Sequence, residues 1–140
     1  MRPIIILSAL LLATSAARAD IAPPPDHGPT QVTVAGLKFE IGSHRVKMPP
    51  GYYKSYPVAV LAGCVENHPN CKLAQAQNVI GAEVQSVDGE PLEAAKGRLR
   101  QIVDHFAETK TPVTLEFLRP NAAGAVSVGF APVTTKVYWP

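Results

Sequence analysis

The chain has 140 residues, with 13 Lys and Arg against 11 Asp and Glu. Two of the basic residues, Arg2 and Arg18, lie in an N-terminal segment that we expect to be removed, and without them the balance is 11 of each. A neutral chain lacks the basic surface typical of nucleic-acid-binding proteins, so nucleic acid is not an expected partner. The remaining length is enough for one domain and too short for two.

Residues Met1–Ala19 have the pattern of a secretory signal peptide. Arg2 supplies a positive charge, Ile4–Ala13 is an almost unbroken apolar run, and Ala17-Arg18-Ala19 has the small-x-small pattern of a cleavage site. A membrane-spanning anchor would need about 20 apolar residues, roughly twice the length of this run. We therefore expect cleavage before Asp20, a periplasmic or secreted protein, and no stable membrane insertion.

The first half of the remaining chain contains a spacer and three strand-like segments. Asp20–Gln31 holds four prolines and predicts an extended spacer. Val32–Val34 and Leu37–Ile41 follow, and in the second segment apolar residues alternate with charged ones, as in a half-buried strand. The polar segment Ser43–Ser55, interrupted by Pro49-Pro50-Gly51, predicts a long loop. Tyr56–Val65 predicts a buried strand.

The second half predicts one main helix between strands. The polar segment Glu66–Gln77 is expected to be a connection, and Asn78–Val87 is apolar and ends at an Asp88-Gly89 turn signal. Apolar residues at helical spacing then form a single stripe: Leu92, Ala95, Leu99, Ile102, Val103 and Phe106. Pro112 ends the helix, Val113–Leu118 predicts a strand, and Ala125–Phe130 with Thr134–Tyr138 predicts a final hairpin.

The order of these elements and two of their turns resemble the PDZ family. The segment Gly81–Leu92 contains the Val-Asp-Gly turn of that family, and a helix (Glu93–Ala107) and an apolar strand ending in Arg (Val113–Arg119) follow it. Gly36-Leu37-Lys38-Phe39 resembles the Gly-Leu-Gly-Phe loop that binds a peptide carboxylate, with Lys38 replacing a glycine. Pro57–Val65 resembles the third strand. The second departure concerns the Gly-Leu-x-x-Gly-Asp stretch that usually precedes the fourth strand in the family. In this chain only Leu73–Ile80 stands at that place, and it lacks the motif's glycines.

This resemblance covers residues 32–119 and implies an α+β fold. We expect a small PDZ-like, partly open β-barrel or sandwich of five to six strands with one main α-helix. The rest of the chain then divides into a signal peptide (1–19), a proline-rich spacer (20–31) and a C-terminal strand or hairpin extension (120–140). A PDZ domain binds an extended peptide as an added strand, mainly through backbone hydrogen bonds.

The resemblance also implies a peptide-binding groove between strand Phe39–Ile41 and the helix. The N–H groups of Leu37, Lys38 and Phe39 would hold the terminal carboxylate, and the side chains of Leu37 and Phe39 would line the pocket beneath it. The peptide-binding residues implied in this way are Gly36, Leu37, Lys38, Phe39, Ile41, Lys96, Arg100 and Val103. An ordinary solvent-facing position remains the alternative for Lys38, Lys96 and Arg100.

The two cysteines, Cys64 and Cys71, flank a polar segment in a chain that we expect to be exported. A disulfide is the favoured interpretation in an oxidising compartment. With His68, the two thiolates would supply three zinc ligands, but no fourth ligand stands at a diagnostic spacing. We expect no metal and no cofactor.

The sequence therefore predicts an exported adaptor or scaffold that holds an extended or C-terminal peptide of another envelope protein. No common catalytic motif is present, and a hidden enzyme would have to use Glu83, Asp88, His68 or His105. Two alternatives stay open. One is a small metal-handling or redox-accessory protein that uses Cys64, His68 and Cys71, and the other is a structural subunit of an envelope complex that docks through Val126–Trp139.

Overall fold

The computed structural model describes residues 26–119 and 124–132. The signal segment, the first half of the spacer and the predicted strand Thr134–Tyr138 lie outside these ranges. The described strands are β1 (Gln31–Val34), β2 (Leu37–Met48), β3 (Tyr52–Cys64), β4 (Glu83–Val87), β5 (Glu90–Pro91), β6 (Val113–Leu118) and β7 (Ala125–Phe130). The helical elements are α2 (Pro69–Ala76), the short 3₁₀ turn η1 (Ala94–Lys96) and α3 (Arg98–Glu108).

The strands form one antiparallel sheet in the order β1-β2-β3-β4-β6-β7, with β5 paired to β4. The α+β fold class is thus confirmed, but the sheet is open and does not close into a barrel. β7 confirms the strand expected at Ala125–Phe130, and its partner is β6. Within the described residues, no helix has the length and hydropathy needed to cross a membrane.

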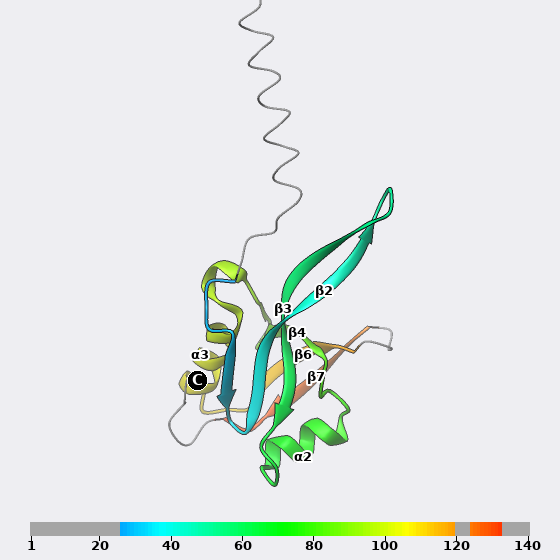
Figure 1. The fold of residues 1–140 in the computed structure, drawn as a ribbon. Helices are drawn as coiled ribbons and strands as arrows, with labels where there is room; N and C mark the ends of the chain where they lie inside the picture. The colour runs from blue at the N-terminus through cyan, green and yellow to red at the C-terminus, as the bar shows by residue number, and fades with distance from the viewer. Residues whose placement is uncertain (1–25, 120–123, 133–140) are drawn as a thin grey trace, which may run out of the picture.

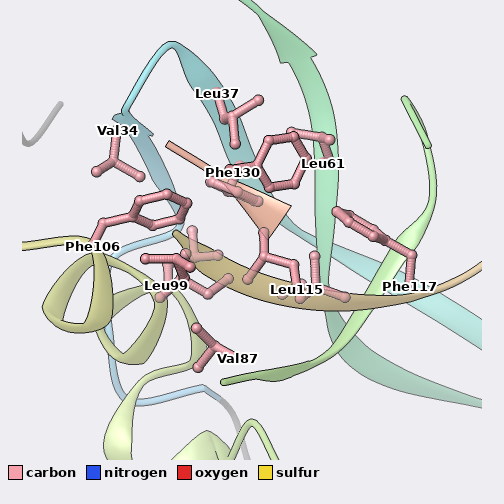
Figure 2. Close-up of a cluster of buried hydrophobic side chains, with 14 of the residues drawn as sticks. Val34, Leu37, Leu61, Val87, Leu99, Phe106, Leu115, Phe117 and Phe130 are labelled. Atoms are coloured by element: carbon pink, nitrogen blue, oxygen red, sulfur yellow. The ribbon is translucent and has the colours of Figure 1, made fainter. Parts of the chain in front are cut away.

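The core lies between α3 and one face of the curved sheet (Figure 2). The predicted apolar stripe is confirmed within α3, where Leu99, Ile102 and Phe106 are completely buried. Its first two members lie before the helix, and Ala95 is exposed. The three buried side chains pack with side chains from the sheet, among them Phe117 and Phe130, whose rings meet edge to face at 6.2 Å. Each large apolar side chain buried in this way contributes about 1.5–3 kcal/mol, which makes this layer the main source of stability.

Helix α3 begins at Arg98, later than the predicted start at Glu93. Gly97 precedes it with φ +83°, a conformation that side chains other than glycine rarely adopt, so the chain turns before the helix starts. The carboxylate of Asp26 accepts from the Arg98 backbone N–H at 3.3 Å and pairs with the Arg98 guanidinium at 2.8 Å. A carboxylate at a helix N-terminus compensates the free N–H groups there. Asp26 therefore fixes the segment before β1 against α3.

The segment Ser43–Ser55 is not the loop that its polarity predicted. β2 and β3 pair without interruption from Gly42–Val58 to Met48–Tyr52, so this segment forms the outer half of a long hairpin. Figure 1 shows it rising away from the rest of the sheet as a twisted two-stranded ribbon. We call residues 42–58 the ribbon and the remaining described residues the body. None of the helices and strands in residues 26–119 and 124–132 covers the ribbon, and its strands lack the apolar alternation by which half-buried strands are recognised.

The expected polar connection Glu66–Gln77 contains a helix, α2. The side chain of His68 caps it by accepting from the Asn70 backbone N–H at 3.1 Å. Asn70 itself is buried, and its side chain donates to the carbonyl oxygens of Ala35 (2.9 Å) and Ala131 (3.1 Å). It also accepts from the Ala131 N–H at 2.9 Å. One polar side chain thereby joins the β1–β2 turn, α2 and the end of β7.

Candidate functional site

The strand segment expected to receive a peptide is already paired on both sides. Phe39 lies opposite Val32 of β1 on one side and opposite Leu61 of β3 on the other. Beyond β1, the N–H of Ile41 donates to the Thr30 carbonyl at 2.9 Å. The expectation that Phe39–Ile41 forms an open edge is therefore wrong, because the chain's own β1 occupies that edge.

β1 also packs against α3, so it lies between the strand and the helix that the resemblance gives to the two walls of a peptide groove. Val32 and Val34 of β1 are buried, as are Leu37 (0% exposed) and Phe39 (1% exposed) of β2. These four side chains belong to the core. The buried side chains of Leu37 and Phe39 are consequently closed to a peptide, which corrects their expected role. Phe39 does border a surface hollow of about 420 Å³, together with Lys38, Ala62 and Gly63, but with almost none of its surface exposed.

Gly36 forms the turn between β1 and β2 with φ +77°, and a side chain there would overlap the ring of His68. Its carbonyl accepts from the Val65 N–H at 2.8 Å. This glycine is needed for a close approach inside the fold. Lys38 is exposed on β2, the solvent-facing position that was its alternative, and Ile41 is partly buried against the core.

The helix side of the expected groove is also different. Val103 is 3% exposed and packs into the core, so its predicted groove-facing position is wrong. Lys96 lies in η1, before the helix, with its ammonium 2.9 Å from Glu93 and 3.6 Å from Glu90. The hydrogen bond to Glu93 and the negative charges raise the pKa of Lys96. Arg100 is exposed on α3.

The cysteines are joined, as the sequence predicted. The Cys64 and Cys71 sulfurs are 2.01 Å apart and the Cα atoms 5.2 Å apart. The bridge connects the end of β3 to α2, and His68 uses Nδ1 to cap that helix. With both sulfurs bonded to each other, the thiolates required by the metal-handling alternative are absent. The described residues contain no group of three or more His, Cys, Asp and Glu side chains placed to share a metal ion.

The four residues considered for catalysis, Glu83, Asp88, His68 and His105, do not form one cluster. Only Asp88 and His105 meet, with the His105 Nδ1 3.0 Å from the Asp88 carboxylate and Nε2 3.3 Å from Glu90. Burial favours the neutral ring, but the hydrogen bonds and charges of the two carboxylates outweigh it and raise the pKa of His105. Gln101 donates to Glu90 at 2.8 Å and is the main cause of the lowered pKa of Glu90.

This cluster ties the β4–β5 turn to α3. The Asp88 carboxylate also accepts from the Thr114 N–H at 2.8 Å. The cluster therefore joins the β4–β5 turn, α3 and the start of β6. Of the remaining two candidates, Glu83 lies 3.6 Å from His44 at the base of the ribbon, and His68 caps α2.

The ribbon adds a further backbone edge to those of β1 and β7, the outer strands of the sheet in the body. Because successive residues of a strand direct their N–H and C=O groups to opposite sides, and Ile41 points outward to Thr30, residues Ser43, Arg45 and Lys47 also point outward. Pro57 lies opposite Ser43, at a position where its missing N–H removes no bond to β2. Among the described residues, no strand pairs with the outer side of Gly42–Met48.

The other outer side of the ribbon belongs to β3. This strand pairs with β4 only at Ala59 and Val60 and then separates from it. A hollow of about 400 Å³ lies in the fork. Its lining combines apolar and polar residues: Ser43, His44, Val58, Val60, Gly81, Glu83, Leu118 and Arg119. Pro57 interrupts the backbone donors along this side, so it is the poorer of the two edges for pairing.

Comparisons with known proteins give no relative: no family model, no curated protein and no solved structure matches the chain.

Proposed function

We propose that this protein is an exported binding module that holds an extended segment of another envelope protein as an added strand on the outer edge of β2. The observation that carries the proposal is the outward backbone of Ser43, Arg45 and Lys47, which no other described strand uses. The site lies on the strand to which the PDZ resemblance directed attention, moved toward the ribbon because β1 fills the first part. The Met1–Ala19 pattern and the Cys64–Cys71 bridge support export.

Strand addition suits this edge for a physical reason. An unpaired strand edge presents a ready row of donors and acceptors, and pairing with an extended chain satisfies them. β1 already runs along β2 as far as Thr30, where the chain turns toward α3. A bound segment would extend the sheet from that point outward, in line with β1.

The test compares two proline substitutions on the two edges of the ribbon. Ser43→Pro removes an outward N–H from the proposed edge, whereas Ser55→Pro removes one from the opposite edge. Peptides would first be selected on the protein from a random peptide library and synthesised. We expect Ser43→Pro to weaken their binding at least tenfold, about 1.4 kcal/mol, and Ser55→Pro to leave the affinity within about twofold.

Hydrogen exchange locates the bound peptide independently. A strand added to β2 should protect the amides of Ser43, Arg45 and Lys47, and circular dichroism should show both proline variants to be folded. The proposal fails if the two variants lose affinity equally or if protection maps away from β2. Intact mass of the exported protein tests the export step, with Asp20 as the expected first residue.

A structural subunit of an envelope complex is the second candidate, because β1 already fills the expected groove. In that case the β2 edge would be covered permanently by a partner subunit. The two functions differ in the behaviour of the isolated protein. A reversible binding module should elute as a stable monomer on size-exclusion chromatography, while an obligate subunit should aggregate.

A further inference from the structure

The end of the ribbon combines apolar exposure with positive charge. Met48–Tyr53 contains no charged residue, and Tyr52 and Tyr53 are 51% and 56% exposed. Lys47 and Lys54 flank this segment directly, Arg45 stands one position further along the same face as Lys47, and no Asp or Glu occurs from Ile41 to Val65. We call Met48–Tyr53 the tip. In Figure 1 the tip is the described part furthest from the body.

The backbone of the tip has few free donors. Pro49 and Pro50 carry no N–H, and the N–H of Gly51 donates to the Met48 carbonyl at 2.7 Å inside the turn. A donor that loses water without finding a partner costs several kcal/mol in a hydrocarbon-like medium. Three successive residues of the tip therefore have no free N–H donor to desolvate when they leave water.

Aromatic and basic side chains lie on both faces of the ribbon. The register places Arg45, Lys47 and Tyr53 on one face, where the Arg45 guanidinium lies 4.4 Å from the centre of the Tyr53 ring. Tyr52, Lys54 and Tyr56 share the opposite face, where the Lys54 ammonium lies 5.5 Å from the centre of the Tyr56 ring. Aromatic and basic side chains thus surround the tip on both faces. A ribbon that bound a partner through one face would carry such side chains on that face alone.

We propose that the tip is a membrane-docking element that enters the headgroup region of an anionic phospholipid bilayer end-on, with Arg45, Lys47 and Lys54 among the lipid phosphates. Tyrosine favours this interface because its ring is apolar and its hydroxyl remains hydrated. Each Lys or Arg near an anionic surface contributes attraction that decays within the Debye length. The interaction is peripheral and reversible, since the tip is far shorter than a spanning segment.

This inference goes beyond the proposed peptide site and does not depend on it. Nucleic acid and acidic protein also attract a basic ribbon, but neither explains a two-proline turn whose remaining donor is already bonded. Such a turn exposes no free N–H donor, which lowers the cost of bringing it close to the hydrocarbon boundary. The order of groups along the ribbon also matches a bilayer. When the ribbon enters end-on, the apolar tip reaches toward the hydrocarbon boundary while the basic residues behind it lie at the level of the phosphates.

The test uses flotation of the protein with two kinds of vesicle. One is pure phosphatidylcholine, and the other contains about a third phosphatidylglycerol, which gives it a negative surface. We expect at least tenfold stronger partitioning to the anionic vesicles, equivalent to about 1.4 kcal/mol. Raising the salt concentration should weaken it by shortening the Debye length.

Two pairs of matched variants identify the tip. Lys47→Glu with Lys54→Glu should weaken anionic binding at least tenfold, whereas the same change at the exposed Lys72 and Lys110 of the body should weaken it by no more than about threefold. Tyr52→Ser with Tyr53→Ser should also weaken binding at least tenfold. Its control is Val65→Ser with Ile80→Ser, which removes two apolar side chains that are 40% and 39% exposed on the body. All variants have the same N-terminal segment, so any binding of that segment to vesicles is equal in all of them. Differences in vesicle binding between variants therefore come from the substituted positions.

Spin-labelled lipid should broaden the amide signals of Met48, Gly51, Tyr52 and Tyr53 selectively in nuclear magnetic resonance spectra. The proposal is overturned if neutral and anionic vesicles bind equally, if the body variants lose as much as the tip variants, or if broadening maps to the body. It is equally overturned if the protein ignores vesicles but binds polyglutamate or single-stranded DNA. The Ser43→Pro variant should bind vesicles normally, which separates this site from the proposed peptide edge.

Discussion

The two halves of β2 differ in the strands that pair with them and in the layer that covers them. The first half, Leu37–Ile41, is paired with β1 and β3, and it directs Leu37 and Phe39 into the core beneath α3. Among the described residues, the second half, Gly42–Met48, is paired with β3 alone, and no described layer covers either of its faces. Backbone pairing is enough to maintain the strand, but apolar alternation appears only where a second layer covers it. An uncovered strand half with one open edge is therefore where we expect contacts with other molecules.

The largest expected difference between the halves concerns aromatic side chains. Phe39→Ala removes a completely buried ring and should lower the free energy of unfolding by about 3–5 kcal/mol. Tyr53→Ala removes an exposed ring that contacts Arg45, and it should cost about 1 kcal/mol or less. Equilibrium unfolding in urea measures both. Equal losses in the free energy of unfolding would show that the ribbon contributes to stability as much as the body does. The contrast between the two halves of β2 would then be wrong.

The two hairpin turns offer a second, smaller contrast. Gly36 and Gly51 both have positive φ, +77° and +143°, but only at Gly36 would a side chain overlap a neighbour, the His68 ring. Gly36→Ala combines backbone strain with this overlap and should cost about 2–4 kcal/mol. Gly51→Ala adds strain in open space and should cost about 1–2 kcal/mol.

Thermal unfolding ranks the two glycine variants directly. The Gly36→Ala protein should melt at the lower temperature, and removal of the His68 ring in a Gly36→Ala, His68→Ala protein should recover part of the loss. A larger effect at Gly51 would mean that the ribbon turn is more constrained than its surroundings indicate.

The smallest expected effect is a pH dependence of the free energy of unfolding, caused by His105 in the body. Because Asp88 and Glu90 raise the pKa of His105 in the folded protein, their interaction with the charged ring stabilises the fold below the unfolded-state pKa of about 6.5. That contribution is lost as the pH rises through the higher folded-state pKa. The free energy of unfolding should therefore decrease slightly over this range, and His105→Gln should remove that decrease.

Urea titrations of both proteins at several pH values above and below 6.5 provide the measurement. The same pH slope in the parent and in His105→Gln would refute the assignment to this cluster. Faster exchange of the Thr114 amide at the higher pH values, beyond the intrinsic increase, would locate the change, because this amide donates to Asp88.

Local patterns in the sequence were sufficient for much of the body. β6 begins and ends where the run Val113–Leu118 predicted, and the apolar stripe of α3 identified Leu99, Ile102 and Phe106 as core residues. The disulfide also followed from the two cysteines and the expected export. These features depend on spacing along the chain or on a short sequence separation, which a sequence displays directly.

The pairing of β1 and the length of the ribbon were not visible in this way. Val32–Val34 predicted a strand, but its residues do not say which edge it covers, and that edge proved to be the expected peptide site. The ribbon has a polar pattern because it has no covering layer, so Ser43–Ser55 was interpreted as a loop. A signal was present nevertheless: β-branched and tyrosine residues, Val46, Tyr52 and Tyr53, flank the Pro-Pro-Gly turn.

The buried amide of Asn70 has a consequence for the order in which the chain can fold. Its hydrogen bonds to Ala35 and Ala131 connect segments that emerge from a ribosome or a translocation pore at very different times. Until Ala131 arrives, closing the body around Asn70 would leave buried polar groups without partners, at a cost of about 1–3 kcal/mol each. The hairpin and α2 can form early, but the compact body is favoured only after nearly all of the described chain has emerged. Late closure of this kind would keep the chain unfolded during synthesis, which the proposed export through a membrane channel would require.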